Sequence, residues 1–229
     1  MLNRQHHHDA GPMPTPSIPL FVPLGDSAVL IRFGDSLSEA ANRAAIAAAT
    51  QIEAAALPGI VEVCPSLVSV LIRYEARRTD LPTLTGELRL VLSNSSSSDA
   101  RPIRQKRIAL TFDGDDLDEV ASRLALSPEQ FIAAHNALPL RVLSTGFSPG
   151  FLYCGFHPDS LRLPRRDTVR RRVEPGTVLF AAGQTAITST AIPTGWHVIG
   201  HTAFRNFDPA ANPPVSVAAG DAVSFEVAP

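Results

Sequence analysis

Lysine is almost missing from this chain, because Lys106 is the single lysine among 229 residues. A Walker A loop needs a lysine between glycine and serine or threonine, and Lys106 lies in the run Arg104-Gln105-Lys106-Arg107, so the sequence carries no P-loop. A lysine Schiff base is excluded as well, since an exposed lysine lacks the desolvation that activates the amine. If ATP takes part in the chemistry, we expect another chain or an unfamiliar site to hold it.

Cysteine and long hydrophobic runs are also scarce. Cys64 and Cys154 are the only two cysteines and lie far apart among apolar residues, which favours two free thiols over a disulfide. No apolar run approaches the roughly twenty residues of a membrane span. A signal-peptide core is not expected, because the N-terminal stretch is interrupted by Pro12, Pro14, Pro16 and Pro19. We therefore expect a cytoplasmic location.

Neither sign of charge is in large excess. Lysine and arginine number 20 and the acidic residues 22, which gives a net charge of −2 and no general attraction to nucleic acid or anionic membrane. Hydrophobic residues make up 45% of the chain, enough for a core and a weak hint of a buried interface. His6, His7 and His8 lie in a polar tail and favour a disordered segment over a metal site.

The hydrophobic pattern predicts two domains. We expect a disordered tail at 1–17, an α+β domain at 18–92, a serine-rich linker at 93–102 and a mainly-β domain at 103–229. The first domain is expected to hold strands and helices in the order β-β-α-β-β-α. Their expected ranges are 18–22, 28–33, 36–56, 60–64, 68–74 and 81–92, with a capping box from Ser36 to Glu39 at the first helix.

The second domain is predicted to begin with a strand and two short helices. Ser127, Pro128 and Gln130 supply an N-cap, a proline at the first helical position and a capping-box partner. The remaining sequence consists of short strands punctuated by glycine and proline, which indicates a closed antiparallel barrel. The expected first elements are a strand at 107–112, helices at 115–124 and 127–136, and a strand at 140–145.

The stretch from 146 to 155 is rich in glycine and aromatic residues and is not patterned for packing alone. Its first five residues, Gly146-Phe147-Ser148-Pro149-Gly150, match the G-x-S-x-G elbow of serine hydrolases. Pro149 argues against that function, because it has no N–H for an oxyanion hole and disfavours helical backbone at Ser148. We instead expect a turn whose glycines let the backbone approach a ligand or a partner.

Six ordered motifs carry a resemblance to a known family. After Gly-Phe-x-Pro-Gly-Phe-x-Tyr at 146–153 the sequence has Leu-Pro-Arg at 163–165, Gln-Thr at 184–185, Pro-Thr-Gly-Trp at 193–196, Ile-Gly-His-Thr at 199–202 and Phe-Asp at 207–208. From about residue 24 onward the chain resembles the B subunit of 5-oxoprolinase, a carboxyltransferase-type subdomain also called allophanate hydrolase subunit 1. The family includes an inhibitor of a sporulation histidine kinase.

The resemblance implies a cyclophilin-like barrel for the second domain and a role as a non-autonomous subunit of an ATP-dependent amidohydrolase that opens 5-oxoproline to glutamate. The implied partners are a paralogous C subunit, which is similar to allophanate hydrolase subunit 2, and a third 5-oxoprolinase subunit. ATP, with magnesium, would act in the full complex. Two alternatives stay open, a subunit of an allophanate or urea-type amide hydrolase and a protein inhibitor of a sensor histidine kinase.

The family motifs also nominate site residues, while no catalytic nucleophile is assigned. Arginine suits bidentate binding of carboxylate or phosphate, and Arg165 and Arg170 stand where the family pattern places its arginines. His135 is a candidate acid or base, although a contact at its helix end is the competing interpretation. The expected ligand-binding residues are Phe147, Pro149, Gly150, Tyr153, Arg165, Arg170, Gln184, Thr185 and Trp196.

His197 and His201 have the spacing of helical zinc ligands, but glycines flank them and the local pattern is that of a strand. On a strand this spacing would place them on one face about 13 Å apart, too far for one metal. We therefore predict no metal site. Both positions also depart from the family, as does Gln184-Thr185-Ala186-Ile187-Thr188-Ser189, which lacks the family's tyrosine. These departures indicate a divergent member.

Overall fold

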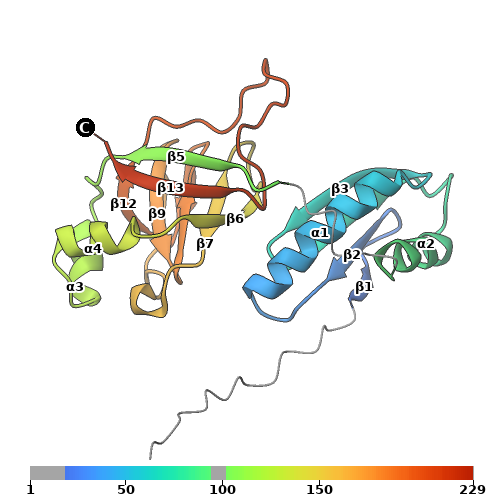
Figure 1. Ribbon diagram of the computed structural model, residues 1–229, viewed down its shortest axis with the longest axis horizontal. Helices are drawn as coiled ribbons and strands as arrows, with labels where there is room; N and C mark the ends of the chain where they lie inside the picture. Colours follow the sequence, from blue (N-terminus) through green and yellow to red (C-terminus); the bar gives the residue numbers. More distant parts are fainter. Residues whose placement is uncertain (1–18, 94–101, 229) are drawn as a thin grey trace, which may run out of the picture.

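The computed structural model describes residues 19–93 and 102–228, and the two larger of its β-sheets lie toward opposite ends of the molecule (Figure 1). The expected N-terminal tail lies outside the described residues, as does all of the expected linker except its first and last positions. Within the described ranges, no helix has both the length and the apolar character needed to cross a membrane. The division into two independent domains stays a prediction.

The first sheet has four antiparallel strands in the order β1-β2-β4-β3, and two helices pack on it. The elements are β1 Leu20–Pro23, β2 Ala28–Arg32, α1 Glu39–Ala55, β3 Ile60–Ser66, β4 Ser69–Tyr74 and α2 Leu81–Ser93. Alternate residues of β2 and β4 face the helices, as a period of two requires. The deeply buried members of this core are Val29, Ile31, Ile52, Val70, Ile72, Leu84 and Leu88. The element order agrees with the sequence prediction.

The N-cap of helix α1 lies two residues later than predicted. Ser38, and not Ser36, is the N-cap, because its backbone is extended and its Oγ accepts a hydrogen bond from the Ala41 N–H at 3.2 Å. The predicted capping box is therefore wrong. Glu39 instead occupies the first turn, where the helix dipole favours its carboxylate, and it forms an ion pair with Arg43.

The second sheet has seven strands in the order β12-β9-β10-β7-β6-β13-β5. Its strands are β5 Gln105–Leu110, β6 Leu140–Thr145, β7 Leu152–Gly155, β9 Thr177–Ala181, β10 Gln184–Ile187, β12 His197–His201 and β13 Ala222–Val227. The antiparallel pair of β8 Arg170–Val173 and β11 Ile192–Thr194 forms a separate two-stranded sheet. Strands β5 and β13 run parallel, so the expected purely antiparallel arrangement is wrong at this pair.

The two edge strands of the second sheet approach each other. Thr111, which follows β5, and His201 of β12 form an isolated bridge with hydrogen bonds of 2.9 Å in both directions. Glycine permits this approach, because a Cβ on Gly200 would lie 2.1 Å from the Thr111 carbonyl oxygen. One bridge curls the sheet without a continuous ladder between its edges, and the closed barrel therefore stays a prediction.

Two short helices, α3 Leu117–Arg123 and α4 Pro128–His135, lie at one end of the curled sheet (Figure 1). The predicted capping box of α4 is confirmed, because Ser127 Oγ accepts from the Gln130 N–H and the Gln130 side chain accepts from the Ser127 N–H. This cap fixes where α4 begins. Its last residue, His135, consequently points into the core, where it is 1% exposed.

Asn42 joins the two sheets. Its side chain is fully buried and donates to the Leu67 carbonyl at 2.6 Å and the Leu143 carbonyl at 2.8 Å. Its Oδ1 accepts from the Arg141 Nε at 3.1 Å. A single amide on α1 thus satisfies groups from the β3–β4 turn and β6.

We expect Asn42→Ala to lower the free energy of unfolding by about 2 to 3 kcal/mol, since it leaves two buried carbonyls without donors. Urea unfolding followed by the fluorescence of the single tryptophan, Trp196, measures this. Glu53→Ala, on an exposed position of the same helix, is the matched control. Equal midpoints for the two variants would contradict the role of Asn42.

Candidate functional site

The glycine-rich stretch forms a turn at 146–151, which we call the aromatic turn, and β7 follows it at once. Gly146 and Gly150 have φ values of 132° and 86°, and Phe147 has 76°. A positive φ is easily adopted by glycine but strained for phenylalanine. Phe147 is nevertheless 73% exposed, so burial of its own ring does not explain the strain. Strained residues of this kind concentrate at ligand and partner sites.

Gly150 holds the aromatic turn against the segment that contains Phe207. A Cβ on Gly150 would lie 2.8 Å from the Phe207 Cβ and 3.1 Å from its backbone nitrogen, closer than side chains tolerate. Ser148 Oγ and Ser189 Oγ share a hydrogen bond of 2.8 Å, which fastens the turn to the end of β10. The partner of Ser148 is therefore a serine and not a histidine, which removes the serine-hydrolase interpretation.

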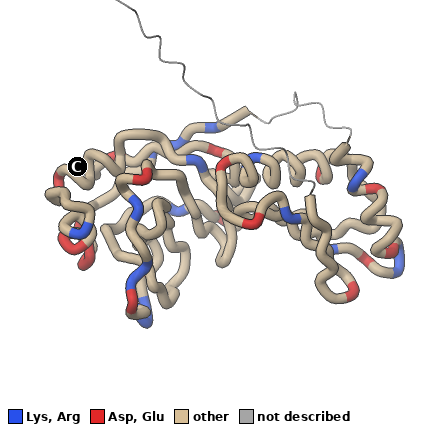
Figure 2. Tube along the Cα trace, turned by 90° about the horizontal axis from the view of Figure 1, so that it is seen from below, with Lys and Arg blue, Asp and Glu red and all other residues tan. Residues whose placement is uncertain are grey.

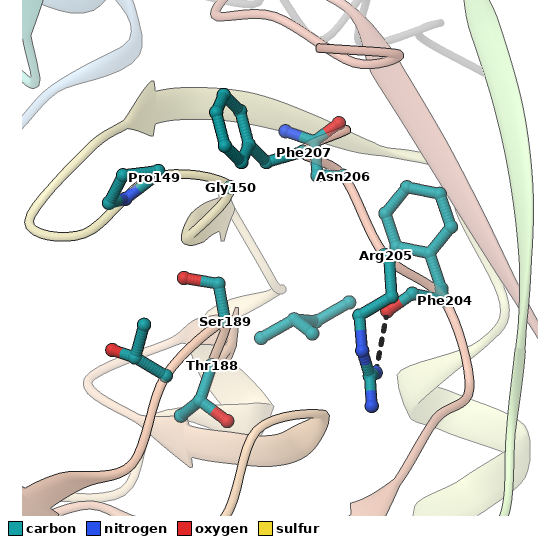
Figure 3. Close-up of a pocket in the computed structure, with 10 residues that line it drawn as sticks. Pro149, Gly150, Thr188, Ser189, Phe204, Arg205, Asn206 and Phe207 are labelled. Atoms are coloured by element: carbon teal, nitrogen blue, oxygen red, sulfur yellow. Dashed lines mark hydrogen bonds between the residues drawn. The ribbon is translucent and has the colours of Figure 1, made fainter. Parts of the chain in front are cut away.

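A pocket of about 280 Å³, which we call the turn pocket, opens beside this turn (Figure 3). Two of the predicted ligand residues, Pro149 and Gly150, line it. The other lining residues are Ile187, Thr188, Ser189, Thr190, Phe204, Arg205, Asn206 and Phe207. The sequence analysis missed Arg205, because it stands alone in a loop, outside the arginine-rich run at 162–172 and outside every family motif.

Four other predicted ligand residues lie together on the outer face of the second sheet, in what we call the outer aromatic row. Phe151 contacts Phe147 and Tyr153, at centroid distances of 5.6 and 4.7 Å, and Tyr153 contacts Trp196 at 6.2 Å. The Arg165 guanidinium lies 5.7 Å from the Trp196 ring centroid, within reach of a cation–π interaction. These rings pack on one another, and their ligand role stays a prediction. Burial, partly offset by Arg165, raises the pKa of Tyr153.

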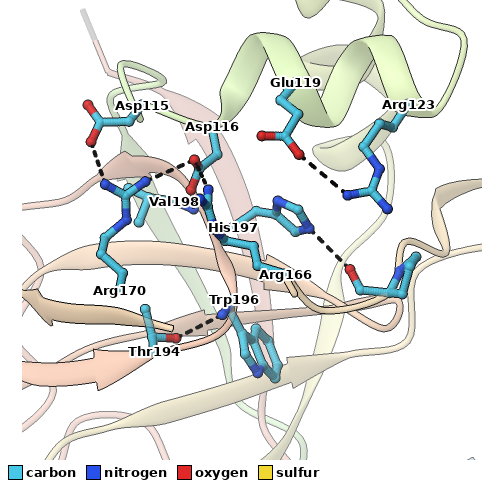
Figure 4. Close-up of polar contacts among 11 residues, drawn as sticks. Asp115, Asp116, Glu119, Arg123, Arg166, Arg170, Thr194, Trp196, His197 and Val198 are labelled. Atoms are coloured by element: carbon cyan, nitrogen blue, oxygen red, sulfur yellow. Dashed lines mark hydrogen bonds and ion pairs between the residues drawn. The ribbon is translucent and has the colours of Figure 1, made fainter. Parts of the chain in front are cut away.

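Arg170, by contrast, forms ion pairs with two carboxylates (Figure 4). Its Nη1 donates to Asp115 at 2.8 Å and its Nη2 to Asp116 at 2.9 Å, while Arg166 also forms an ion pair with Asp116. Burial alone would raise the pKa of Asp116, but hydrogen bonds from the Val198 N–H and both arginines outweigh it and lower the pKa. Asp116 therefore stays ionised and fixes the arginines to the start of α3. A ligand role for Arg170 stays a prediction.

Charged residues of both signs occur along much of the described chain, and many of them pair with one another. Figure 2 shows both signs in most parts of the described trace, with short runs of one sign in places. Several arginines pair locally, as Arg172 does with Glu174 and Arg123 with Glu119.

Gln184 and Thr185, adjacent in sequence, lie on opposite faces of β10. Thr185 is fully buried and pairs across the sheet with Phe180 and Cys154 of the inner core. Gln184 pairs with Ala181 of the outer face and is half-buried. Alternation along a strand requires this separation, so the two residues cannot share one ligand within this chain.

The buried Thr185 links two histidines inside the second sheet. His135 Nε2 lies 2.8 Å and His157 Nε2 2.9 Å from Thr185 Oγ1. His135 Nδ1 lies 2.7 Å from Asn136 Oδ1, which places its proton on Nδ1. Thr185 then donates to His135 Nε2, and His157 Nε2 donates to Thr185. The sequence analysis missed His157, whose neighbours carry no pattern that marks it.

Burial keeps both rings neutral. It lowers the pKa of His135 to about 4 despite the hydrogen bond to Asn136, which favours the charged form. Burial and the neighbouring His135 lower the pKa of His157 to about 3. His135 is thus a helix-end residue inside the core as well as a candidate base, and its acid or base role stays a prediction. Burial likewise raises the pKa of Cys154 to about 12, which makes it a poor nucleophile.

His197 and His201 lie on strand β12, as predicted, but on opposite faces. His197 pairs with Phe180 and His201 with Thr177, and positions three apart on β9 point to opposite sides. The register shift between Val198 and Gly200 causes this difference, which corrects the expectation of one shared face. His197 is buried beneath the Pro164 carbonyl, whereas His201 is exposed and contacts Asp113. No cluster of three or more metal-ligating side chains occurs within 19–93 and 102–228.

The buried histidines predict a loss of stability in acid. The unfolded chain binds their protons near pH 6.5, whereas the folded protein binds them only near pH 4 and 3. Their contribution is therefore complete above pH 6.5 and is lost as the pH falls toward 4, by about 1.4 kcal/mol per pH unit for each histidine.

We expect His157→Gln, which keeps a donor for Thr185, to reduce the slope of unfolding free energy against pH between pH 6 and 4.5. The reduction should equal the contribution of one histidine, about 1.4 kcal/mol per pH unit. Urea unfolding at several pH values measures the slope. His201→Gln, at an exposed position, is the control. A slope unchanged in His157→Gln would contradict the neutral buried pair.

Comparisons with known proteins agree with the resemblance in the motifs. Residues 19–217 match the family described as carboxyltransferase domain, subdomain C and D. A curated Bacillus subtilis (strain 168) protein, named as the B subunit of 5-oxoprolinase, is 32% identical over 220 residues, which cover 88% of this chain and 90% of the relative. The protein of that name from Escherichia coli O157:H7 is 40% identical over 112 residues, 49% of this chain and 51% of the relative.

Solved structures share the fold. The structure of TTHA0988 in space group P212121 has a TM-score of 0.79 and 36% sequence identity, and the match covers 88% of this chain but only 40% of that one. The urea amidolyase of K. lactis has a TM-score of 0.72 at 14% identity, over 94% of this chain and 15% of that chain, which shows likeness of fold alone. The chain belongs to the family of carboxyltransferase-domain subdomains C and D, in which its curated relatives are named as the B subunit of 5-oxoprolinase.

Proposed function

We propose that this chain works as the B subunit of an ATP-dependent, 5-oxoprolinase-type amidohydrolase. The observation that carries the proposal is the match to the 5-oxoprolinase B subunit of Bacillus subtilis, which runs over nine-tenths of that protein's length. A match of this extent spans both sheets, the aromatic turn and the turn pocket. The substrate would be a small cyclic amide with a carboxylate, and the reaction would release glutamate.

A partner chain is part of the proposal. This chain spans less than half of TTHA0988, so a related fold occurs there within a longer polypeptide. The described residues offer buried histidines and a buried thiol but no activated nucleophile. The strained and exposed Phe147 supplies a rigid aromatic anchor of the type that protein interfaces use. We infer that the site is completed by a paralogous C subunit, with a third subunit in the complex.

ATP, with magnesium, would be held by another chain. Lys106, the single lysine, is exposed, and its ammonium lies 5.9 Å from the Phe204 ring centroid. It follows no glycine-rich loop, so the residues present do not fit a phosphate-binding lysine of the Walker type. Phosphate transfer would therefore take place on another chain of the complex.

The outer aromatic row would be the share of the site that faces this partner. Arg165 is exposed, and no carboxylate within the described ranges pairs with it. Trp196 orients its guanidinium from one side, so the charge can meet an anionic group without first breaking an ion pair. Gln184 lies on the same outer face of the sheet.

Glutamate release from 5-oxoproline and ATP tests the function. The three preparations are this chain alone, the candidate partner subunits without it, and the full mixture. We expect turnover only in the full mixture. A full mixture that forms a stable complex but releases no glutamate would contradict the proposed function, as would equal turnover without this chain.

Within an active mixture, we expect Arg165→Ala to lower kcat/KM at least tenfold, the loss expected for one charge-assisted contact of about 1.5 kcal/mol or more. Arg171→Ala, which removes an exposed charge from the neighbouring strand β8, is the matched control. Unchanged turnover in Arg165→Ala would overturn the role of this arginine and leave the subunit assignment standing.

A further inference from the structure

Arg205 brings an unneutralised charge to the turn pocket. It is the only charged residue among the ten that line the pocket, and none of the carboxylates in the described ranges forms an ion pair with it. Figure 3 shows its side chain on one side of the pocket, opposite Ser189 and Thr188. A cation without a counter-ion in a concave, partly apolar site favours an anionic ligand.

The guanidinium is held so that one edge stays open. Its Nη1 donates to the carbonyls of Thr202 at 3.3 Å and Phe204 at 3.1 Å. Gly176 makes room for this arrangement, because a Cβ there would lie 2.8 Å from the same nitrogen. Of the five N–H donors of arginine, two are thereby used, and three remain on Nε and Nη2 without an acceptor among the described residues. These two nitrogens form the fork that binds a carboxylate in bidentate fashion.

The rest of the pocket limits what that anion can be. Thr188 and Asn206 are not available, because their polar atoms are engaged with Glu174, Thr177, Ser216 and Val217. Ser148 and Ser189 use one hydroxyl proton in their mutual bond, so the second can be donated to a ligand. Apolar walls come from Pro149, Ile187, Phe204 and Phe207.

These features describe one cation, a hydroxyl donor from the Ser148–Ser189 pair and an open pocket of about 280 Å³ with apolar walls. That volume is at the lower end for ligand pockets and suits a molecule of amino-acid size. A phosphate dianion would leave a second charge without a partner here. A monocarboxylate with a compact ring or aliphatic body satisfies the fork and the apolar walls together.

We propose that the turn pocket binds a small monocarboxylate through the Nε and Nη2 atoms of Arg205, with the Ser148–Ser189 hydroxyl pair as a second donor. This carboxylate-binding pocket lies within this chain, so binding needs no partner subunit, whereas the reaction does. The identity of the ligand rests on the proposed function: the turn pocket holds the carboxylate of the cyclic amide substrate. Arg205 would then bind and orient the substrate and would take no part in bond breaking.

Isothermal titration of the full chain, without partner subunits, tests the site. The probes are 5-oxoproline, its uncharged analogue 2-pyrrolidinone and inorganic phosphate. We expect 5-oxoproline to bind at least tenfold more tightly than either of the others. Three results would each overturn the proposal: binding of 2-pyrrolidinone with equal affinity, binding of phosphate as tight as that of 5-oxoproline, or no binding of 5-oxoproline at concentrations up to about 10 mM.

Variants locate the binding. We expect Arg205→Met to weaken 5-oxoproline binding at least tenfold, Arg205→Lys to weaken it as well because the fork is lost, and Ser189→Ala to weaken it about threefold. Arg77→Met, at an exposed position of the first sheet's β4–α2 turn, is the matched control. Ser189→Ala leaves the contacts of Arg205 with Thr202 and Phe204 in place, so it tests the site even if an Arg205 variant fails to fold. Unchanged affinity in Arg205→Lys and Ser189→Ala would overturn the site.

The titration is independent of catalysis. Binding that depends on Arg205, together with a full mixture that releases no glutamate, would retain the pocket and remove the proposed function. Turnover by the full mixture with no 5-oxoproline binding to this chain would retain the proposed function and reject the pocket as a carboxylate site.

Discussion

The whole second sheet depends on strand β9 being buried on both faces. All five residues from Thr177 to Ala181 are buried, with Val178 and Phe180 in the inner core and Leu179 and Ala181 in an outer one. A strand of this kind separates its neighbours' side chains into two populations that cannot meet. The linked histidines are consequently confined to the inside and the outer aromatic row to the outside. A ligand site that uses side chains from both populations can therefore form only at the turns, where the alternation of the strands stops.

The aromatic turn is such a place, and glycine is what makes it one. Gly150 lets the turn approach Phe207 more closely than any side chain would allow, and the Ser148–Ser189 bond holds it there. The same approach closes one side of the turn pocket. The strain at Phe147 is thus built into a segment that is fixed from two directions, which is the condition under which strained backbone persists.

Most of the fold could be predicted, because its signals are local. The capping box of α4 and the limits of β6 follow from residues within one turn or one strand, and they are observed where expected. The errors arise where the decisive contact is distant in sequence. The parallel pairing of β5 with β13 joins residues more than 100 positions apart, and the bulge in β12 is visible only in its pairing with β9. The N-cap at Ser38 was missed because Ser36 has Glu39 three positions later, the capping-box spacing that Ser38 lacks.

The candidate site was less predictable, for an electrostatic reason. Sequence motifs direct attention to clustered arginines, but clustering also brings carboxylates, and Arg170 and Arg166 are neutralised by Asp115 and Asp116. A neutralised arginine must lose an ion pair before it can bind an anion, at a cost comparable to the contact it would gain. Arg205 carries no such cost, because only backbone carbonyls hold it. Its isolation, which hid it from motif analysis, is therefore the property that makes it suited to bind an anion.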